Sequence, residues 1–141
     1  MLIGKNPLNE APDWFVKNIE NRPEECSVSV NGAEIKYFVW GDRSKKPLLL
    51  LHGYNAHSYW WDHIAPALTE SHCVVALDFS GMGESARREE YSQEIFVEDV
   101  KGVIDDLAWS ACTCIAHSTV SYTHLRAHET DSYLVCRLLL E

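Results

Sequence analysis

The sequence predicts an α/β fold in which a short hairpin leads into a parallel sheet with flanking helices. Asn31-Gly32 lies between two segments that alternate apolar and polar residues, which is a strong hairpin signal. Between the later apolar runs, apolar residues recur at helical spacing. A hairpin followed by alternating strands and helices is typical of a doubly wound sheet. The continuous apolar runs, typical of central strands covered on both faces, lie at 47–53, 73–79 and 111–116.

The remaining elements follow in chain order. A short amphipathic helix is expected within 11–23, where Pro23 ends it. A second helix is expected over 58–71, because Trp61, Ile64 and Leu68 recur at helical spacing. A turn-rich loop over 80–92 leads into a third helix over 92–109. The apolar stripe of that helix consists of Ile95, Val100, Val103, Ile104 and Leu107.

Composition and charge restrict the class of protein. The chain has 141 residues, of which 46% are hydrophobic and 23% charged, as in a single soluble domain. Its formal net charge of −9 disfavours a nucleic-acid partner. The basic pairs Lys45-Lys46 and Arg87-Arg88 are each interpreted as solvated loops. No signal peptide or membrane-spanning run is found, so a cytoplasmic protein without a membrane partner is expected.

Cysteine and glycine patterns point away from metals and cofactors. The sequence contains 5 Cys without the spacing of a disulfide framework or a zinc site. Cys112 and Cys114 alternate along one buried strand, which favours packing of reduced thiols. Gly81 and Gly83 lack the third glycine of a dinucleotide loop and are interpreted as turn glycines. No metal and no cofactor is therefore expected.

Polar motifs follow the three apolar strands. His52-Gly53-Tyr54 follows the first, the segment 78–85 (DFSGMGES) follows the second, and Ala116-His117-Ser118 ends the third. Ligands of open α/β sheets bind at these strand ends. With these motifs in this order, the chain from about Asp13 to Ser118 resembles the N-terminal half of an α/β-hydrolase-fold enzyme.

The resemblance implies a mechanism and assigns residues to it. Ser118 would be the nucleophile on a tight strand-to-helix turn, with the backbone N–H groups of Tyr54 and Thr119 forming the oxyanion hole. Relatives that open epoxides or displace halide carry Asp at the nucleophile position. Ser118 therefore implies serine hydrolysis of an ester, thioester, amide or carbon–carbon bond in a small-molecule substrate. The alternative is a non-catalytic ligand-binding protein on the same fold.

Other residues near these motifs have two interpretations. His52 and Gly53 are candidates for lining the pocket, although His52 and His117 are more often structural than catalytic. Trp60 and Trp61 are candidates for lining a substrate entrance, and core packing is an equally open alternative.

The end of the chain departs from the family pattern. In this family the residue two positions after the nucleophile is glycine or alanine, because the turn is too tight for a larger side chain. The sequence has Val120 at that position. Residues 120–130 and 134–141 resemble the conceptual translation of a transposase-type sequencing adapter. The adapter's reading frame allows only Ser, Pro, Thr or Ala at position 119 and only Tyr, His, Asn or Asp at 133. Thr119 and Tyr133 both comply.

The predicted organisation is therefore a partial α/β-hydrolase domain over 1–118, a junction codon at 119 and an artefactual tail over 120–141. In this fold the acid and the His of the triad follow the nucleophile in the chain, so the chain as written is expected to be inactive. The tail is expected to make no packed contact with the sheet and at most a short helix through Leu134–Leu140. The nucleophile strand would then remain an exposed edge.

Overall fold

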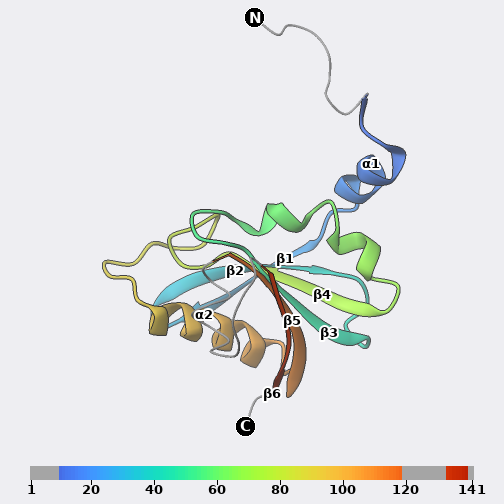
Figure 1. Ribbon diagram of the computed structural model, residues 1–141. Coiled ribbons are helices and arrows are strands. Elements are labelled where there is room, and N and C mark those ends of the chain that lie inside the picture. Colours follow the sequence, from blue (N-terminus) through green and yellow to red (C-terminus); the bar gives the residue numbers. More distant parts are fainter. Residues whose placement is uncertain (1–9, 119–132, 140–141) are drawn as a thin grey trace, which may run out of the picture.

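The computed structural model describes residues 10–118 and 133–139. They form one sheet with strand order β1-β2-β4-β3-β5-β6, flanked by helices (Figure 1). The elements in chain order are α1 (Asp13–Glu20), β1 (Glu24–Val30), β2 (Ala33–Trp40), β3 (Lys46–Leu51), η2 (Ser58–Trp61), η3 (Ala65–Leu68), β4 (His72–Leu77), α2 (Gln93–Asp106), β5 (Ala111–His117) and β6 (Tyr133–Leu139).

The sheet begins with the predicted hairpin and continues with parallel strands. Asn31 and Gly32 connect β1 to β2 with φ values of 48° and 82°, the left-handed backbone that a two-residue hairpin turn requires. β2 pairs antiparallel with β4, and β3 pairs in parallel with both β4 and β5. The C-terminal ends of β3, β4 and β5 therefore meet at one edge of the sheet. The predicted α/β fold is confirmed.

The two faces of the sheet bury different side chains, as the two-residue period of a strand requires. Leu49 and Leu51 belong to the core cluster that includes α2. Leu48 and Leu50 belong to a second cluster that includes Trp61 of η2. Helical elements thus cover both faces, which confirms the doubly wound arrangement (Figure 1).

The continuous helix predicted over 58–71 is wrong. Two short 3₁₀ turns, η2 and η3, occupy this segment. Pro66 lies in the first turn of η3. Proline has no backbone N–H to donate, and inside a continuous helix its ring would clash with the carbonyl group one turn earlier. The backbone N–H of Ser58 is bonded to Asp78 Oδ1 at 2.6 Å, which ties the start of η2 to another loop. Trp61 is buried, but Ile64 is 41% exposed and Leu68 is half-buried. The periodicity was therefore wrong about helix length and right about the buried side only at Trp61.

The expectation for the end of the chain is also corrected. Residues 133–139 form a strand, β6, rather than a helix, and pair antiparallel with β5 from Ala111↔Leu139 to His117↔Tyr133. An edge strand presents unpaired backbone N–H and C=O groups, which favour pairing with any extended segment that can reach them. β5 is therefore an inner strand, and the exposed edge expected there is not found.

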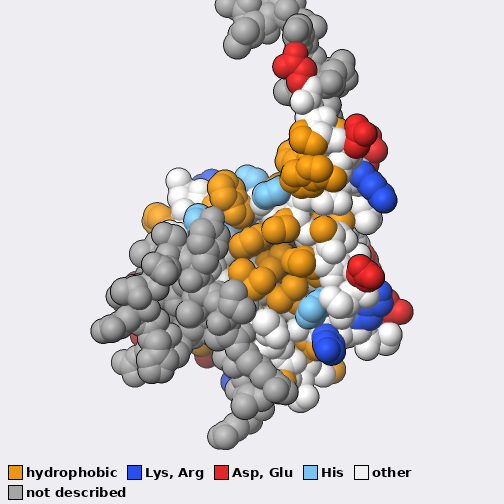
Figure 2. Space-filling view, turned by 45° about the vertical axis from the view of Figure 1, so that its right-hand side comes forward, with side chains coloured by type: hydrophobic (Ala, Val, Ile, Leu, Met, Phe, Trp, Pro, Cys, Tyr) orange, Lys and Arg blue, Asp and Glu red, His pale blue; other side chains and the backbone are white. Residues whose placement is uncertain are grey.

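Helix α1 lies outside the two core clusters. It contains no buried residue, and Trp14 is 58% exposed. Asn18 Nδ2 donates to the carbonyl oxygen of His63 at 2.8 Å, which attaches the helix to the segment between η2 and η3. Figure 2 shows hydrophobic side chains on α1 and on the face of the molecule below it. Within the described residues, no helix combines the length and apolar character needed to cross a lipid bilayer.

Candidate active site

Ser118 follows directly after β5 and has a strained backbone. Its φ of 67° lies in the left-handed region, which non-glycine residues rarely adopt. Strain of this kind persists only where the surrounding structure fixes it, and it concentrates at functional sites. The serine that the sequence singled out is thus presented on a sharp turn at the C-terminal edge of the sheet.

The loop after β3 approaches this serine closely. A Cβ atom placed on Gly53 would lie 3.0 Å from Ser118 Cβ and 3.2 Å from His117 Nδ1, closer than real Cβ atoms normally approach. Glycine at position 53 therefore lets the two loops meet without a shift of Ser118 or His117. The fold brings together the first and third sequence motifs, which are more than sixty residues apart.

The other predicted site residues differ in their exposure. Tyr54 is 71% exposed, and Trp60 is 49% exposed and stacks on the ring of His117 with centroids 5.4 Å apart. Trp61, the last residue of η2, is buried in the second core cluster, so it adopts the packing alternative. Thr119 lies outside the described residues.

His52 fixes the start of the loop after β3. The ring is fully buried and packs edge-on against Phe79. The backbone N–H of Phe79 donates to Nε2 at 3.2 Å, so Nδ1 carries the proton and donates to the carbonyl oxygen of Gly53 at 2.8 Å. Burial lowers the pKa of His52, which keeps the ring neutral near pH 7. His52 therefore takes the structural alternative and holds Gly53 in place.

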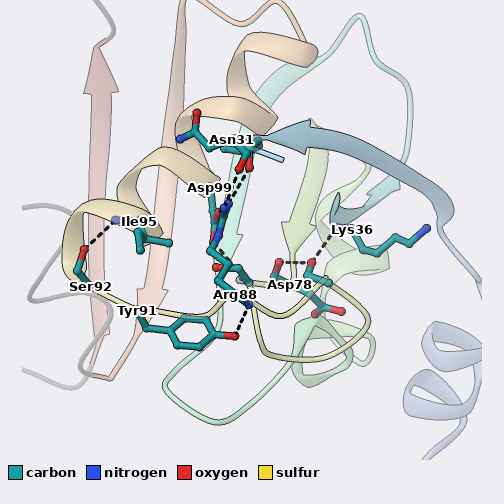
Figure 3. A network of polar contacts seen from close by, with 11 residues as sticks. Asn31, Lys36, Asp78, Arg88, Tyr91, Ser92, Ile95 and Asp99 are labelled. Atoms are coloured by element: carbon teal, nitrogen blue, oxygen red, sulfur yellow. Dashed lines mark hydrogen bonds and ion pairs between the residues drawn. The ribbon is translucent and has the colours of Figure 1, made fainter. Parts of the chain in front are cut away.

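Asp78, the first residue of the second motif, organises the loop after β4. Its buried carboxylate accepts hydrogen bonds from the backbone N–H groups of Ser58 at 2.6 Å and Glu84 at 2.8 Å. Ser85 Oγ donates to the carbonyl oxygen of Asp78 at 2.5 Å and accepts from the N–H of Lys36 at 2.8 Å (Figure 3). The motif thus joins three separate segments, a role that the sequence did not reveal.

The interpretation of Arg87-Arg88 as a solvated pair is wrong for Arg88. Its Nη2 lies 2.8 Å from Oδ1 of the fully buried Asp99 and also donates to the carbonyl oxygen of Val30 at 2.8 Å (Figure 3). The second oxygen of Asp99 accepts from the N–H of Ser80 at 2.9 Å. No local pattern predicts this network, because Arg88 and Val30 are far apart in the sequence. Arg87 is exposed, as expected.

A cavity of about 580 Å³ opens beside the loop after β3. Its walls come from that loop, from the loop after β4 and from the start of α2. No Asp or Glu is among the described residues that line it. The polar lining includes Tyr54, Asn55, Ser80, Arg87, Arg88 and Gln93. Elsewhere in the described part of the chain, no three His, Cys, Asp or Glu side chains are grouped so that they could hold a metal ion.

The fold and this geometry define a class: α/β proteins that carry a serine on a sharp turn after a central strand. Comparison with known families agrees with this fold class. The family model of the α/β hydrolase fold matches residues 46–119, and the chain belongs to this family.

Individual relatives and solved structures that match the chain carry the names of hydrolases and of a thioesterase. The chain is 37% identical over 97 residues to "Epoxide hydrolase 4" of Mus musculus, a match that covers 65% of this chain and 27% of the relative. It is 32% identical over 97 residues to "Serine hydrolase-like protein" of Mus musculus, covering 67% of this chain and 31% of the relative. The solved "Thioesterase Domain From Curacin Biosynthetic Pathway" matches with a TM-score of 0.68 and 27% identity, covering 73% of this chain and 40% of that chain. The chain thus spans about a third or less of the length of these curated relatives.

Proposed function

We propose that residues 1–118 are the N-terminal part of a cytoplasmic serine hydrolase that cleaves an ester, thioester, amide or carbon–carbon bond of a small molecule. The observation that carries this proposal is the left-handed backbone of Ser118 at the end of β5, directly against Gly53. The names of the serine hydrolase-like relative and of the thioesterase domain support it. Cys26 and Cys73 are free thiols, which supports a reducing compartment.

The proposed reaction has two steps. Ser118 Oγ bonds to the carbonyl carbon of the substrate while its proton passes to a general base, and the bond to the leaving group breaks as that group takes the proton. Water then hydrolyses the acyl-serine ester in the same way. The backbone N–H groups of Tyr54 and residue 119 would stabilise the oxyanion, and each such donor contributes about 3 kcal/mol to lowering the barrier.

Gly53 contributes to this arrangement through its size. Because it lacks a Cβ, the loop after β3 lies close enough to Ser118 for the neighbouring N–H of Tyr54 to serve the same carbonyl oxygen. His52 holds the Gly53 carbonyl from the other side. The exposed face of Trp60, stacked on His117, would form one wall of the substrate entrance.

Epoxide opening, which the name of one relative suggests, is less compatible with a serine. Attack of a serine oxygen on an epoxide carbon forms an ether, which has no carbonyl carbon for water to attack. A carboxylate nucleophile would instead form an ester that water can hydrolyse. Ser118 therefore favours acyl substrates.

The proposal includes the organisation predicted from the sequence, with a junction at position 119 and an adapter-derived tail over 120–141. The general-base His and its acidic partner would then be encoded downstream of Ser118 in the native gene. Without them the serine hydroxyl is a weak nucleophile, so the chain as written should not turn over substrate. Amplification of the gene past codon 118 tests this directly. We expect Gly or Ala at position 120, and a genomic sequence that continues as VSYTHL would contradict the proposal.

The enzymatic test uses the full-length protein recovered from that gene. We expect it to hydrolyse 4-nitrophenyl acetate, and we expect Ser118→Ala to abolish turnover and labelling by a fluorophosphonate probe. Ser27→Ala on the exposed side of β1 is the matched control and should retain both. Activity that is indifferent to Ser118→Ala would favour the non-catalytic ligand-binding protein. Turnover of styrene oxide that depends on Ser118 would overturn the assignment to acyl substrates.

A further inference from the structure

The cavity beside Tyr54 has an unusual charge for this chain. Two arginines, Arg87 and Arg88, line it, and no Asp or Glu is among its described lining residues. The whole chain has 21 acidic and 12 basic residues. Arg88 is paired with the buried carboxylate of Asp99, so Arg87 supplies the uncompensated positive charge. An unpaired guanidinium and no carboxylate in the described lining suit the cavity electrostatically to an anion.

Ser80 gives a second, independent indication of a ligand. The residue is fully buried and lines the cavity, yet its hydroxyl has no hydrogen-bond partner among the described residues. Its backbone N–H is already bonded to Asp99, so the position of the residue is fixed. A buried hydroxyl without a partner destabilises the folded state, and each such group calls for an explanation.

The arginines also retain donors that are not used. Arg88 is held by Asp99 and by the carbonyl oxygens of Val30 and Asn31, but its Nε lies buried without a hydrogen-bond partner in the described part of the chain. Arg87 makes no ion pair or hydrogen bond with any described residue and is exposed at the rim. A guanidinium can only donate, so the complementary group must be an acceptor, and a planar carboxylate fits it best.

The N-terminus of α2 borders the same cavity, but it is already capped and is not needed to bind a ligand. Ser92 already caps it, since its Oγ accepts from the N–H of Ile95 at 3.3 Å. The buried hydroxyl of Ser80, the guanidinium of Arg87 and the Nε of Arg88 are the groups that point to a ligand.

We propose that this cavity binds a carboxylate group of the substrate, so that the enzyme prefers esters or thioesters that carry a second, free carboxylate. This inference rests on the proposed serine hydrolase function. Tyr54 connects the two sites, because it lines the cavity and its N–H is the proposed oxyanion donor. A substrate with its carboxylate on Arg87 and Ser80 would place its remaining length along the loop that leads to Ser118.

Binding is measured separately from catalysis. In the full-length Ser118→Ala protein, ligand-observed NMR compares hexanoate with the uncharged hexanamide. We expect hexanoate to bind more tightly, and Arg87→Gln or Ser80→Ala to weaken its binding about tenfold. Lys101→Gln on α2 and Ser27→Ala on β1 remove a positive charge and a hydroxyl from exposed positions outside the cavity. They are the matched controls and should leave binding unchanged.

Stability distinguishes a binding role of Ser80 from a structural one. Because the hydroxyl has no partner in the described chain, Ser80→Ala should leave the urea unfolding midpoint unchanged or raise it. A lower midpoint would show that the hydroxyl serves the fold and would overturn its role in binding.

Kinetics tests the link to the substrate. In the wild-type enzyme, the kcat/KM for 4-nitrophenyl hemisuccinate should exceed that for 4-nitrophenyl butyrate, and Arg87→Gln should reduce this ratio. Equal binding of hexanoate and hexanamide, or binding that survives both cavity variants, would overturn the carboxylate site. Hexanoate binding without a preference for the hemisuccinate would overturn its role as a substrate subsite. Hexanoate binding in a protein that hydrolyses neither ester would support the carboxylate site and overturn the hydrolase proposal.

Discussion

Two loops leave the same edge of the sheet and differ in how many buried polar contacts hold them. The loop after β4, residues 78–92, is fixed by buried polar groups: Asp78 accepts two backbone N–H groups, and Asp99 pairs with Arg88 and the N–H of Ser80. The loop after β3, residues 52–57, is anchored at its start by His52 and then exposes Tyr54. One loop serves as a rigid support, and the other presents its backbone to the serine.

Backbone strain follows the same division. The left-handed positions of the loop after β4 are Gly81 and Gly83, which adopt this conformation without steric cost. At the candidate site the left-handed positions are Asn55 and Ser118, with φ values of 58° and 67°. Among the described residues, the other non-glycine positions with a left-handed backbone are Asn31 in the hairpin turn and Ala108 after α2. Ser118 differs from these turn positions in being the proposed reacting residue, and strain at such a residue is typical of functional sites.

Removing Arg88 should have the largest effect on stability. In the full-length protein, Arg88→Met leaves the buried carboxylate of Asp99 without a cation and should lower the free energy of unfolding by about 3–5 kcal/mol. Urea unfolding measures this loss. The control is Arg22→Met, which breaks an ion pair with Asp62 whose arginine is 70% exposed and should cost less than about 1 kcal/mol. Equal losses would show that the buried Arg88–Asp99 pair does not hold the loop after β4 more firmly than an exposed ion pair would.

Gly53→Ala should act on activity more than on stability. The added methyl group would press on Ser118 Cβ at 3.0 Å and shift it by a few tenths of an ångström. Since a misplacement of about 1 Å costs about a hundredfold, we expect kcat to fall by about tenfold. Gly32→Ala is a useful control, because its φ of 82° is strained for alanine but a Cβ there meets nothing within 4 Å. That control should lose about 1 kcal/mol of stability and keep full activity. A normal kcat in Gly53→Ala would show that the close approach of the loop after β3 to Ser118 is not needed for catalysis.

His52 should make stability depend on pH. Its pKa in the folded protein lies below the ordinary value of 6.5 because the ring is buried. As pH falls below 6.5, the unfolded chain takes up a proton that the folded chain does not, so stability decreases. The contribution reaches at most about 1.4 kcal/mol per pH unit.

The measurement is urea unfolding at several pH values between 7 and 5. His52→Gln should be less stable at pH 7 and should show a shallower decline on acidification. An unchanged slope would mean that His52 is not the titrating anchor of this loop.

Ser92→Ala should give the smallest effect. The hydroxyl caps α2 by accepting from the N–H of Ile95, and loss of such a cap costs about 1 kcal/mol. Thermal unfolding of the full-length protein should show a slightly lower Tm. Ser92→Asp keeps an acceptor and should restore most of the loss, whereas equal destabilisation by both variants would argue against a capping role.

Local patterns predicted the frame of the molecule well. The Asn31-Gly32 turn, the apolar strands and the strained turn at Ser118 each depend on neighbouring residues, and the structure contains all of them. The helix predicted over 58–71 was wrong because the pattern of apolar residues did not weigh Pro66. The bond from Arg88 to Val30 and the cavity could not be predicted, because they depend on segments that only the fold brings together. The roles of Ser118 and Tyr54 remain predictions.

The strand order has a consequence for synthesis of the chain. β3 is made before β4, yet in the sheet β4 lies between β3 and the completed β1–β2 hairpin. During translation the leucines at 48–51 therefore have no strand to pair with until His72–Leu77 has left the ribosome. Domains fold as their segments emerge, and an unpaired apolar strand is prone to aggregation during that interval. The nascent chain would be most in need of chaperone protection while it ends between β3 and β4.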